Sequence, residues 1–353
     1  MKKIAFFCPT LDVGGVEKVF ITHANYLADS DDYDVHFMLL RDEGSLSSTL
    51  STRVTKDVIG AKRLAVSLPG IIKLLKNNHY DCVFSGTEAT NLLLVVAAKM
   101  ASVSTKVITS QHNYPDIETN ALLHKIIPCV HRNAHLTFAV SKGIVDYLTD
   151  RGVPKNKLYQ INNPIDFSLI RRLANERVGS TLPEEYIVFV GRIYPVKNIP
   201  LLLQSFSFVK DDCPKLKLIV VGDGPNRTIY EHQAEMLGVG DDVMWIGSVS
   251  NPYPYIKNAR LLVISSLTEA SSNVAIEAMC LGVNVVSTPC LGPEEIIDAP
   301  NYGYVAKMNN DAKSLSSAIL QGLEYPISKE KLTTRIASRD ISVISRQLME
   351  MTI

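Results

Sequence analysis

The sequence has no surplus of either charge, because 36 lysine and arginine residues balance 36 aspartate and glutamate residues. Broad binding to nucleic acid needs a basic surplus, since the release of counterions from the phosphates drives that binding. We therefore expect no nucleic-acid partner.

Long apolar runs are also absent. No stretch approaches the roughly 18 apolar residues that a membrane-spanning helix requires. At the amino terminus the apolar run from Ile4 to Cys8 stops at Pro9, which is too short for the apolar region of a signal peptide. We expect a first β-strand there and a cytoplasmic protein.

The cysteines show no C-x-x-C spacing, and most of them lie inside apolar runs. This pattern predicts buried free thiols rather than disulfides or zinc ligands, and it suits a reducing cytoplasm. The six positions are Cys8, Cys82, Cys129, Cys213, Cys280 and Cys290.

Short apolar segments alternate with helix-length segments along most of the chain. The apolar segments are apolar at almost every position, as in parallel strands that helices cover on both faces. The pattern predicts a βαβ series and hence a doubly wound α/β fold. The expected strands are residues 3–8, 34–40, 81–85, 106–110, 136–140, 186–190, 216–221, 243–246, 261–264 and 283–287.

The chain of 353 residues is longer than a single hydrophobic core usually supports, so two domains are expected. The alternation pauses at the turn signal Asn162-Asn163-Pro164 and at a polar break over 179–185, and it restarts at Tyr186. We therefore predict two Rossmann-like domains, 1–175 and 176–330, that face each other across a cleft. The helical segment 331–353 is expected to pack back on the first domain.

The segment from Ser265 to Thr288 predicts a turn, a helix and a second strand after the strand at 261–264. The helix opens among Ser271, Ser272 and Asn273, and its free amides and positive dipole end suit a phosphate. Glu269 on the turn and Glu277 in the helix flank that point. Two glutamates at this spacing occur by chance about once in such a chain, so the spacing alone is weak evidence for a binding site. Its value depends on the motifs around it.

The first strand leads into Gly14 and Gly15, where glycine lets the backbone approach a ligand and a helix start offers free amides. The G-x-G-x-x-G spacing of a dinucleotide site is absent, which disfavours hydride-transfer enzymes. A simple tight turn explains the pair equally well.

Two cations, Arg192 and Lys197, stand between the end of one strand and the start of the next helix. They are well placed to neutralise a diphosphate, with a solvated loop as the alternative. A compact turn that contains Gly222 and Gly224 follows the next strand and can pass close to a base or a ribose. His112, just past a strand end in the first half, can hydrogen-bond to a sugar or an acceptor.

Taken in order, these motifs resemble the retaining glycosyltransferases of family 4, which have the GT-B fold. The resemblance covers nearly the whole chain, and the ordered set is more specific than any member. The motifs that carry it are Gly14-Gly15-Val16-Glu17, His112, Val140-Ser141-Lys142-Gly143, Asn163-Pro164-Ile165-Asp166, Gly191-Arg192, Lys197-Asn198, Gly222-Asp223-Gly224-Pro225, Gly247, and the pair Glu269 and Glu277 with Ala278 and Gly282.

The resemblance implies an N-terminal acceptor-binding domain, a C-terminal nucleotide-sugar-binding domain and a role for each matched residue. It implies that Arg192 and Lys197 hold the nucleotide diphosphate, that Glu277 binds the ribose, and that Glu269 and His112 contact the transferred sugar. The implied catalytic residues are His112, Glu269, Arg192 and Lys197, and the implied donor-binding residues are Gly14, Gly15, Gly191, Gly222, Gly224, Ser272, Asn273, Val274 and Glu277.

No metal and no other cofactor is expected, because the cations and the helix dipole act where the departing diphosphate develops charge. One Asp-x-Asp match, Asp32-Tyr33-Asp34, lies where a strand begins, on the wrong side of the sheet for this cleft. We therefore interpret it as a solvated turn.

The resemblance implies transfer, with retention, of a sugar from a nucleotide diphosphate, with a UDP-sugar as the expected donor. The implied acceptor is a saccharide or lipid-linked saccharide in surface polysaccharide or lipopolysaccharide assembly, which leaves peripheral contact with the inner face of the cytoplasmic membrane open. Ala270-Ser271-Ser272 replaces the usual Gly-Phe-Gly, so the identity of the sugar is not carried over.

Two other functions remain open at this point. One is a nucleotide-sugar epimerase of the GT-B type, which would release an epimerised free sugar instead of a glycoside. The other is a non-catalytic two-domain sugar-binding protein. The sequence disfavours the second, since such a protein is normally exported and no signal peptide is recognised.

Overall fold

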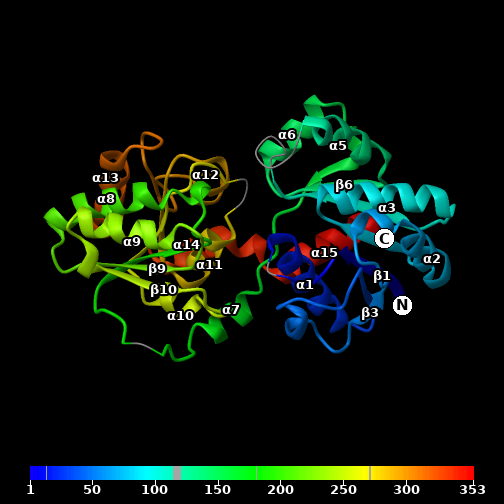
Figure 1. Cartoon of the computed structure of the whole chain (residues 1–353), viewed down its shortest axis with the longest axis horizontal. Helices are drawn as coiled ribbons and strands as arrows, with labels where there is room; N and C mark the ends of the chain where they lie inside the picture. Colours follow the sequence, from blue (N-terminus) through cyan, green and yellow to red (C-terminus); the bar gives the residue numbers. More distant parts are fainter. Residues whose placement is uncertain (13, 114–120, 180, 270–271) are drawn as a thin grey trace. The chain divides into compact units, whose positions relative to one another are not determined.

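The computed structural model describes residues 1–12, 14–113, 121–179, 181–269 and 272–353, and it describes side chains at all of these except 121–124. The chain forms two compact units (Figure 1). Unit 1 comprises Met1–Pro164 and Arg339–Ile353, and unit 2 comprises Ile165–Ser338. Each unit has its own parallel sheet, which confirms the predicted class of two Rossmann-like α/β domains.

The sheet of unit 1 has seven strands in the order β3-β2-β1-β4-β5-β6-β7, and all its pairings are parallel. Alternate residues of these strands point into two different cores. The strands are β1 (Lys2–Cys8), β2 (Tyr33–Leu39), β3 (Thr55–Val58), β4 (Cys82–Ser85), β5 (Lys106–Gln111), β6 (Leu136–Ala139) and β7 (Leu158–Gln160).

Helices cover both faces of this sheet. Phe6 of β1 packs in a core with α1 (Gly15–Ala28) and α15 (Ile341–Thr352), whereas Phe7 points to a core with α2 (Leu68–Asn78) and α3 (Glu88–Ala101). Among the described residues, unit 1 also contains the helices α5 (Ala121–Asn133) and α6 (Lys142–Asp150).

The sheet of unit 2 has six parallel strands in the order β10-β9-β8-β11-β12-β13. The strands are β8 (Tyr186–Val190), β9 (Lys217–Val221), β10 (Val243–Gly247), β11 (Leu261–Ile264), β12 (Asn284–Ser287) and β13 (Tyr304–Val305). The helices are α7 (Phe167–Leu173), α8 (Ile199–Asp212), α9 (Arg227–Met236), α10 (Tyr253–Lys257), α11 (Asn273–Leu281), α12 (Leu291–Ile297), α13 (Ala312–Glu324) and α14 (Lys329–Ile336).

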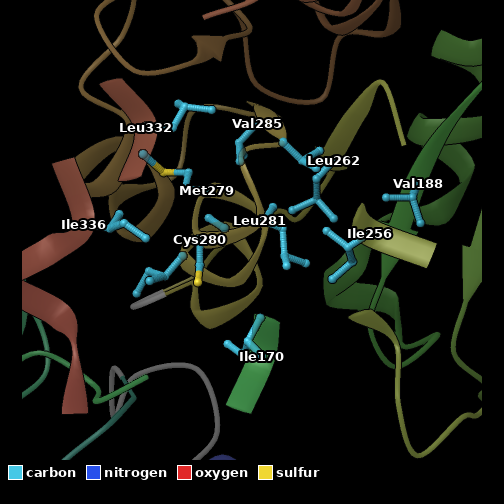
Figure 2. Packing of buried hydrophobic residues seen from close by; sticks show 14 of the residues in the cluster. Ile170, Val188, Ile256, Leu262, Met279, Cys280, Leu281, Val285, Leu332 and Ile336 are labelled. Atoms are coloured by element: carbon cyan, nitrogen blue, oxygen red, sulfur yellow. The ribbon is translucent and has the colours of Figure 1, made fainter. Parts of the chain in front are cut away.

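The core on one face of this sheet holds α11 in place. Met279, Cys280 and Leu281 of α11 lie among buried side chains from α7, α10 and α14, such as Ile170 and Ile256 (Figure 2). Because α11 is anchored through its carboxyl-terminal half, its amino terminus has a fixed position at the carboxyl edge of the sheet.

The division between the units lies after Pro164 rather than near residue 175. The reason is α7, whose Phe167 and Ile170 are buried in the core of unit 2. The segment expected at 331–353 is also divided, since Leu332 and Ile336 of α14 pack in unit 2 whereas Ile344 and Leu348 of α15 pack in unit 1.

Two cysteine predictions were wrong in detail. Cys129 is exposed and Cys213 is half-buried, whereas the other four are buried. All six are free thiols. Within the described ranges, no helix combines the length and the apolar character needed to cross a membrane.

Candidate functional site

The predicted residues of unit 2 gather where its sheet changes direction. β8 and β11 are neighbours, and the chain proceeds from them toward opposite edges of the sheet. In doubly wound sheets, such a switch point leaves a crevice outside the carboxyl ends of the two strands, where ligands bind. Gly191 and Arg192 directly follow β8, and the segment that carries Glu269 follows β11.

Lys197 and Glu269 form an ion pair at this edge. Lys197 Nζ lies 3.2 Å from Glu269 Oε1, and the side chains are 26% and 13% exposed. Ser266 Oγ donates to Glu269 Oε2 over 3.2 Å, and Ser265 Oγ donates to the carbonyl oxygen of Lys197 over 2.7 Å. The two serines after β11 therefore fix both members of the pair.

Arg192 is exposed, and its guanidinium carbon lies 5.2 Å from the centre of the Tyr194 ring. A cation–π contact of this kind holds the side chain over the ring while its N–H groups stay available to oxygen ligands. The arginine therefore adds a second positive charge at the same edge as Lys197.

The glycines after β9 have a packing role of their own. Gly222 has a φ of +143°, and a Cβ there would lie 1.8 Å from the carbonyl oxygen of Gly191. A Cβ at Gly224 would lie 2.2 Å from the carbonyl oxygen of Ile193. The loops after β8 and β9 thus lie backbone against backbone, which requires these glycines without any ligand.

The amino terminus of α11 follows β11 at the same carboxyl edge of the sheet and carries an unsatisfied hydroxyl. Ser272 is the N-cap residue, yet its side chain makes no capping hydrogen bond, and its buried Oγ has no partner among the described residues. The first turn begins with Asn273 and Val274, and the Ser272 side chain does not cap it. Such a terminus favours an anion. Ala270 and Ser271 lie outside the described residues.

Glu277 lies one turn further along α11 and accepts a hydrogen bond from the hydroxyl of Tyr253. Burial, followed by the charge of Glu277, raises the pKa of Tyr253 well above its usual value. The phenol is therefore a proton donor to the carboxylate at any physiological pH.

In unit 1, Gly15 is the first residue of α1 and Gly14 is its N-cap residue, but the two glycines differ in their surroundings. A Cβ at Gly14 would lie 2.0 Å from Glu17 Oε2, so the glycine leaves room for the carboxylate of Glu17. Burial raises the pKa of Glu17. A Cβ at Gly15 would meet no atom within 4 Å, so packing does not require this glycine.

His112 is held inside unit 1 by two side chains. Its Nε2 lies 2.9 Å from Ser110 Oγ, and it also hydrogen-bonds to the side chain of Asn163. Ser110 donates its only proton to the carbonyl oxygen of Ser85, so its oxygen accepts from Nε2–H. Burial lowers the pKa of His112 to about 4, which makes the ring neutral at pH 7.

A cavity of about 30 Å³ adjoins this histidine. Its wall is mainly apolar, and it includes Phe20, whose ring meets the imidazole edge to face at 6.3 Å between centres. His112 thus has its ring set by neighbours on several sides before any ligand binds.

Sequence reasoning missed the residues that orient the predicted ones. Ser266 and Tyr253 contact the two glutamates but lie in no recognised spacing, and Asn163 was interpreted only as a turn residue. Local pattern cannot reveal the contacts of Tyr253 and Asn163, since these residues lie far along the chain from Glu277 and His112, whereas Ser266 is only three residues from Glu269.

Two family models match the chain. The model "Glycosyltransferase Family 4" matches residues 13–169, and "Glycosyl transferases group 1" matches residues 172–339. Together the two matches cover nearly the whole chain.

The chain is similar to two named enzymes of Campylobacter jejuni. "N-acetylgalactosamine-N,N'-diacetylbacillosaminyl-diphospho-undecaprenol 4-alpha-N-acetylgalactosaminyltransferase" is 25% identical over 348 residues, which are 94% of this chain and 92% of the relative. "GalNAc-alpha-(1->4)-GalNAc-alpha-(1->3)-diNAcBac-PP-undecaprenol alpha-1,4-N-acetyl-D-galactosaminyltransferase" is 26% identical over 352 residues, which are 96% and 92% of the two chains. The crystal structure of Anabaena HepE in complex with UDP has a TM-score of 0.82 at 19% identity and covers 99% of both chains.

Proposed function

The chain belongs to glycosyltransferase family 4 and is a glycosyltransferase with the GT-B fold, and from this premise we propose that its donor is a nucleotide-diphosphate sugar. We propose further that the nucleotide is UDP, that the sugar is transferred with retention of configuration, and that no metal takes part. The acceptor is a saccharide or a lipid-linked saccharide.

One arrangement carries the donor proposal. Lys197, Arg192 and the uncapped amino terminus of α11 all lie at the switch point between β8 and β11. A diphosphate placed there has two cations and a positive helix end around it, which is the environment that phosphate oxygens prefer.

The same arrangement supplies catalysis. When the bond between the sugar and the diphosphate breaks, negative charge grows on the departing phosphate. Fixed positive groups stabilise that charge more in the transition state than in the ground state, which lowers the barrier. Because Lys197 and Arg192 already supply two positive charges, we expect turnover to continue in the presence of EDTA.

Retention of configuration follows from a transfer on one face of the sugar. The acceptor hydroxyl attacks from the side that the phosphate leaves, and a phosphate oxygen takes its proton. Glu269, whose position is fixed by Ser266 and Lys197, would lie against the sugar and orient it by hydrogen bonds. No covalent intermediate on the protein is required in this scheme.

The names of the two relatives support a lipid-linked acceptor. Both act on saccharides joined to undecaprenol through a diphosphate, and both transfer an N-acetylgalactosaminyl group. Each is similar to this chain over nearly its full length. The UDP complex of Anabaena HepE supports the choice of nucleotide, since that chain shares the fold.

The experiment is a donor screen. The protein is mixed with UDP-, GDP- and ADP-sugars, and thermal stabilisation and sugar release are measured. A donor stabilises the folded state by mass action, so UDP-N-acetylhexosamines should raise the melting temperature and be hydrolysed slowly without an acceptor. If no nucleotide sugar has either effect, the donor proposal fails.

Glu277→Ala and Arg192→Ala test the site directly. Both should abolish the stabilisation by the donor, since they remove the expected partner of the ribose and a partner of the diphosphate. Arg260→Ala is the control, because Arg260 is a similarly exposed arginine of unit 2 that pairs with Glu185 at the amino ends of the strands. Wild-type turnover in either site variant would contradict the assignment.

A further inference from the structure

Tyr253 is placed by the fold so that its hydroxyl meets Glu277. It is the first residue of α10, and its phenol donates a hydrogen bond to the carboxylate on α11. The contact joins two helices, α10 and α11, which are separated in the sequence by the strand β11. It therefore depends on how the helices pack.

The start of α10 is tied to the end of α7. Asn251 Oδ1 accepts a hydrogen bond from the Tyr253 amide over 3.1 Å. The side-chain nitrogen of the same asparagine donates to the carbonyl oxygen of Leu173 over 2.9 Å and to Glu176 Oε2 over 2.8 Å. The backbone that carries the phenol is therefore fixed from outside its own helix.

The other end of α10 is fixed by the core. Ile256 is fully buried in the cluster that also contains Met279 and Cys280 of α11 (Figure 2). Interiors are packed densely enough that such neighbours cannot shift independently. The distance between the phenol and Glu277 is thus a property of the folded core rather than of two free side chains.

We propose that Tyr253 is a positioning residue that sets the preference of the site for ribose over 2′-deoxyribose by orienting Glu277. This inference rests on the proposed function, in which Glu277 binds the ribose. A carboxylate can accept several hydrogen bonds but donates none when ionised. With one bond occupied by the phenol, its remaining lone pairs point in a fixed direction, and the neighbouring 2′- and 3′-hydroxyls of a ribose can both donate to it.

Fixing the carboxylate also reduces the cost of binding. A glutamate side chain loses rotamer freedom when it binds a ligand, and a residue that is already ordered loses less. Hydrogen bonds to an ionised oxygen are about twice as strong as neutral ones, so their loss is measurable.

The test uses Tyr253→Phe, which removes only the hydroxyl. Dissociation constants for UDP and for 2′-deoxy-UDP are measured by calorimetry, with GDP and ADP and their 2′-deoxy forms in parallel. In the wild type, the ribonucleotide should bind more tightly than its 2′-deoxy form. In the variant, the dissociation constant of the ribonucleotide should rise about tenfold and that of the deoxy form much less, as expected for one hydrogen bond to a charged group.

Tyr186→Phe is the matched control. The Tyr186 hydroxyl is also buried against α10, where it donates to the carbonyl oxygen of Tyr255 over 2.8 Å, but that bond does not involve Glu277. This variant should lose stability without any change in the ratio of the two dissociation constants. A merely structural role of Tyr253 predicts the same behaviour for Tyr253→Phe.

The double variant Tyr253→Phe with Glu277→Gln tests whether Tyr253 acts through Glu277. If Tyr253 acts through Glu277, its substitution should have no further effect on the ratio once the carboxylate is gone. A wild-type ratio in Tyr253→Phe, with the protein folded, overturns the inference and leaves the donor proposal intact. If the wild type binds none of the nucleotides, the donor proposal itself fails and the inference falls with it.

Discussion

Lys197 and Glu269 are held 3.2 Å apart by loops that follow two neighbouring strands, β8 and β11. The carbonyl oxygen of Lys197 and the carboxylate of Glu269 each accept a hydrogen bond from a serine directly after β11. The pair is thus built by the switch point of the sheet. Under the proposed function, its positive member would stabilise the charge that develops on a departing diphosphate.

Lys197→Met should lower turnover strongly while the protein stays folded. The methionine keeps most of the length of the side chain and removes the charge. Loss of one preorganised group that stabilises developing charge costs about 100- to 1,000-fold in turnover. Steady-state rates of glycosyl transfer, or of donor hydrolysis, provide the measurement.

Lys210→Met is the control for that loss. Lys210 Nζ pairs with Asp242 at 2.9 Å in the same unit, and its side chain is 14% exposed. Because this pair lies away from the carboxyl edge of β8 and β11, its loss should lower the melting temperature but leave turnover unchanged. Equal rates for the two lysine variants would contradict the role of Lys197.

Gly15 should tolerate a side chain structurally but not functionally. A Cβ there meets no atom within 4 Å, and alanine favours a helix over glycine by about 1 kcal/mol. Gly15→Ala should therefore keep or raise the melting temperature. If Gly15 has the donor-binding role that the sequence predicts, Gly15→Val should weaken donor binding more than Gly15→Ala does.

Gly222→Ala provides the opposite case. With φ at +143° and a carbonyl oxygen 1.8 Å from the new Cβ, this substitution should unfold unit 2 or lower its stability strongly. Thermal unfolding and donor affinity, measured on all three glycine variants, separate the two kinds of glycine. Full donor affinity in Gly15→Val would contradict the predicted donor-binding role of Gly15.

Ser272→Ala should have no stability cost, unlike most substitutions of an N-cap serine. An N-cap serine usually contributes about 1 kcal/mol through a bond to an amide of the first turn. Ser272 makes no such bond, and its Oγ is buried without a partner among the described residues. Its removal relieves an unsatisfied polar group, so the free energy of unfolding should stay constant or rise.

Asp311→Ala is the comparison for Ser272, since the Asp311 side chain caps α13 through the amide of Ser314. That variant should lose about 1 kcal/mol. Donor affinity should fall in Ser272→Ala alone, because we expect its hydroxyl to donate to the bound diphosphate. Urea denaturation and calorimetry provide the two readings, and a capping-type loss in Ser272→Ala would contradict the interpretation.

Much of the fold could be predicted because its strands are buried on both faces. Tyr186–Val190 and Leu261–Ile264 were predicted with the bounds that the structure has, since nearly every residue in them is buried. The edge strand Thr55–Val58 was missed because none of its four residues is buried, so no apolar pattern marks it. Strand order was not predictable, since it depends on which strands meet in space.

The positions of Arg192, Lys197 and Glu269 at the carboxyl edge of the sheet could be predicted, because each follows a strand, whereas their roles stay predictions. The side chains that contact the predicted site residues could not be predicted. Glu17 folds back over Gly14, and Tyr253 reaches Glu277 from another helix. These contacts depend on side-chain packing between elements, which hydrophobic periodicity does not encode. The sequence therefore indicates where these polar residues lie along the fold better than it indicates which side chains hold them.

Three histidines whose pKa is lowered should make the protein lose stability below neutral pH. Burial lowers the pKa of His23 to about 3 and those of His112 and His131 to about 4. An unfolded histidine has a pKa of about 6.5, so between about pH 4 and 6.5 the unfolded chain binds more protons than the folded one. The stabilisation is complete above pH 6.5 and is lost as the pH falls toward 4.

The size of this effect is about 3 kcal/mol for each histidine whose pKa falls to about 4. His36 acts in the opposite direction: burial alone would lower its pKa, but hydrogen bonds to Asp57 and Asp34 outweigh burial and raise it. Its contribution is complete below the unfolded value and is lost only as the pH rises through its folded pKa. The loss of stability between about pH 4 and 6.5 therefore reflects the histidines whose pKa is lowered in the folded protein.

Urea denaturation between pH 4.5 and 7.5 measures this dependence. His23→Gln should flatten the slope of the free energy of unfolding against pH between about 4 and 6.5, because one of the three groups no longer titrates. In the wild type, Nδ1 of His23 hydrogen-bonds to Ser345 Oγ. An unchanged slope in His23→Gln would show that His23 takes up its proton without unfolding.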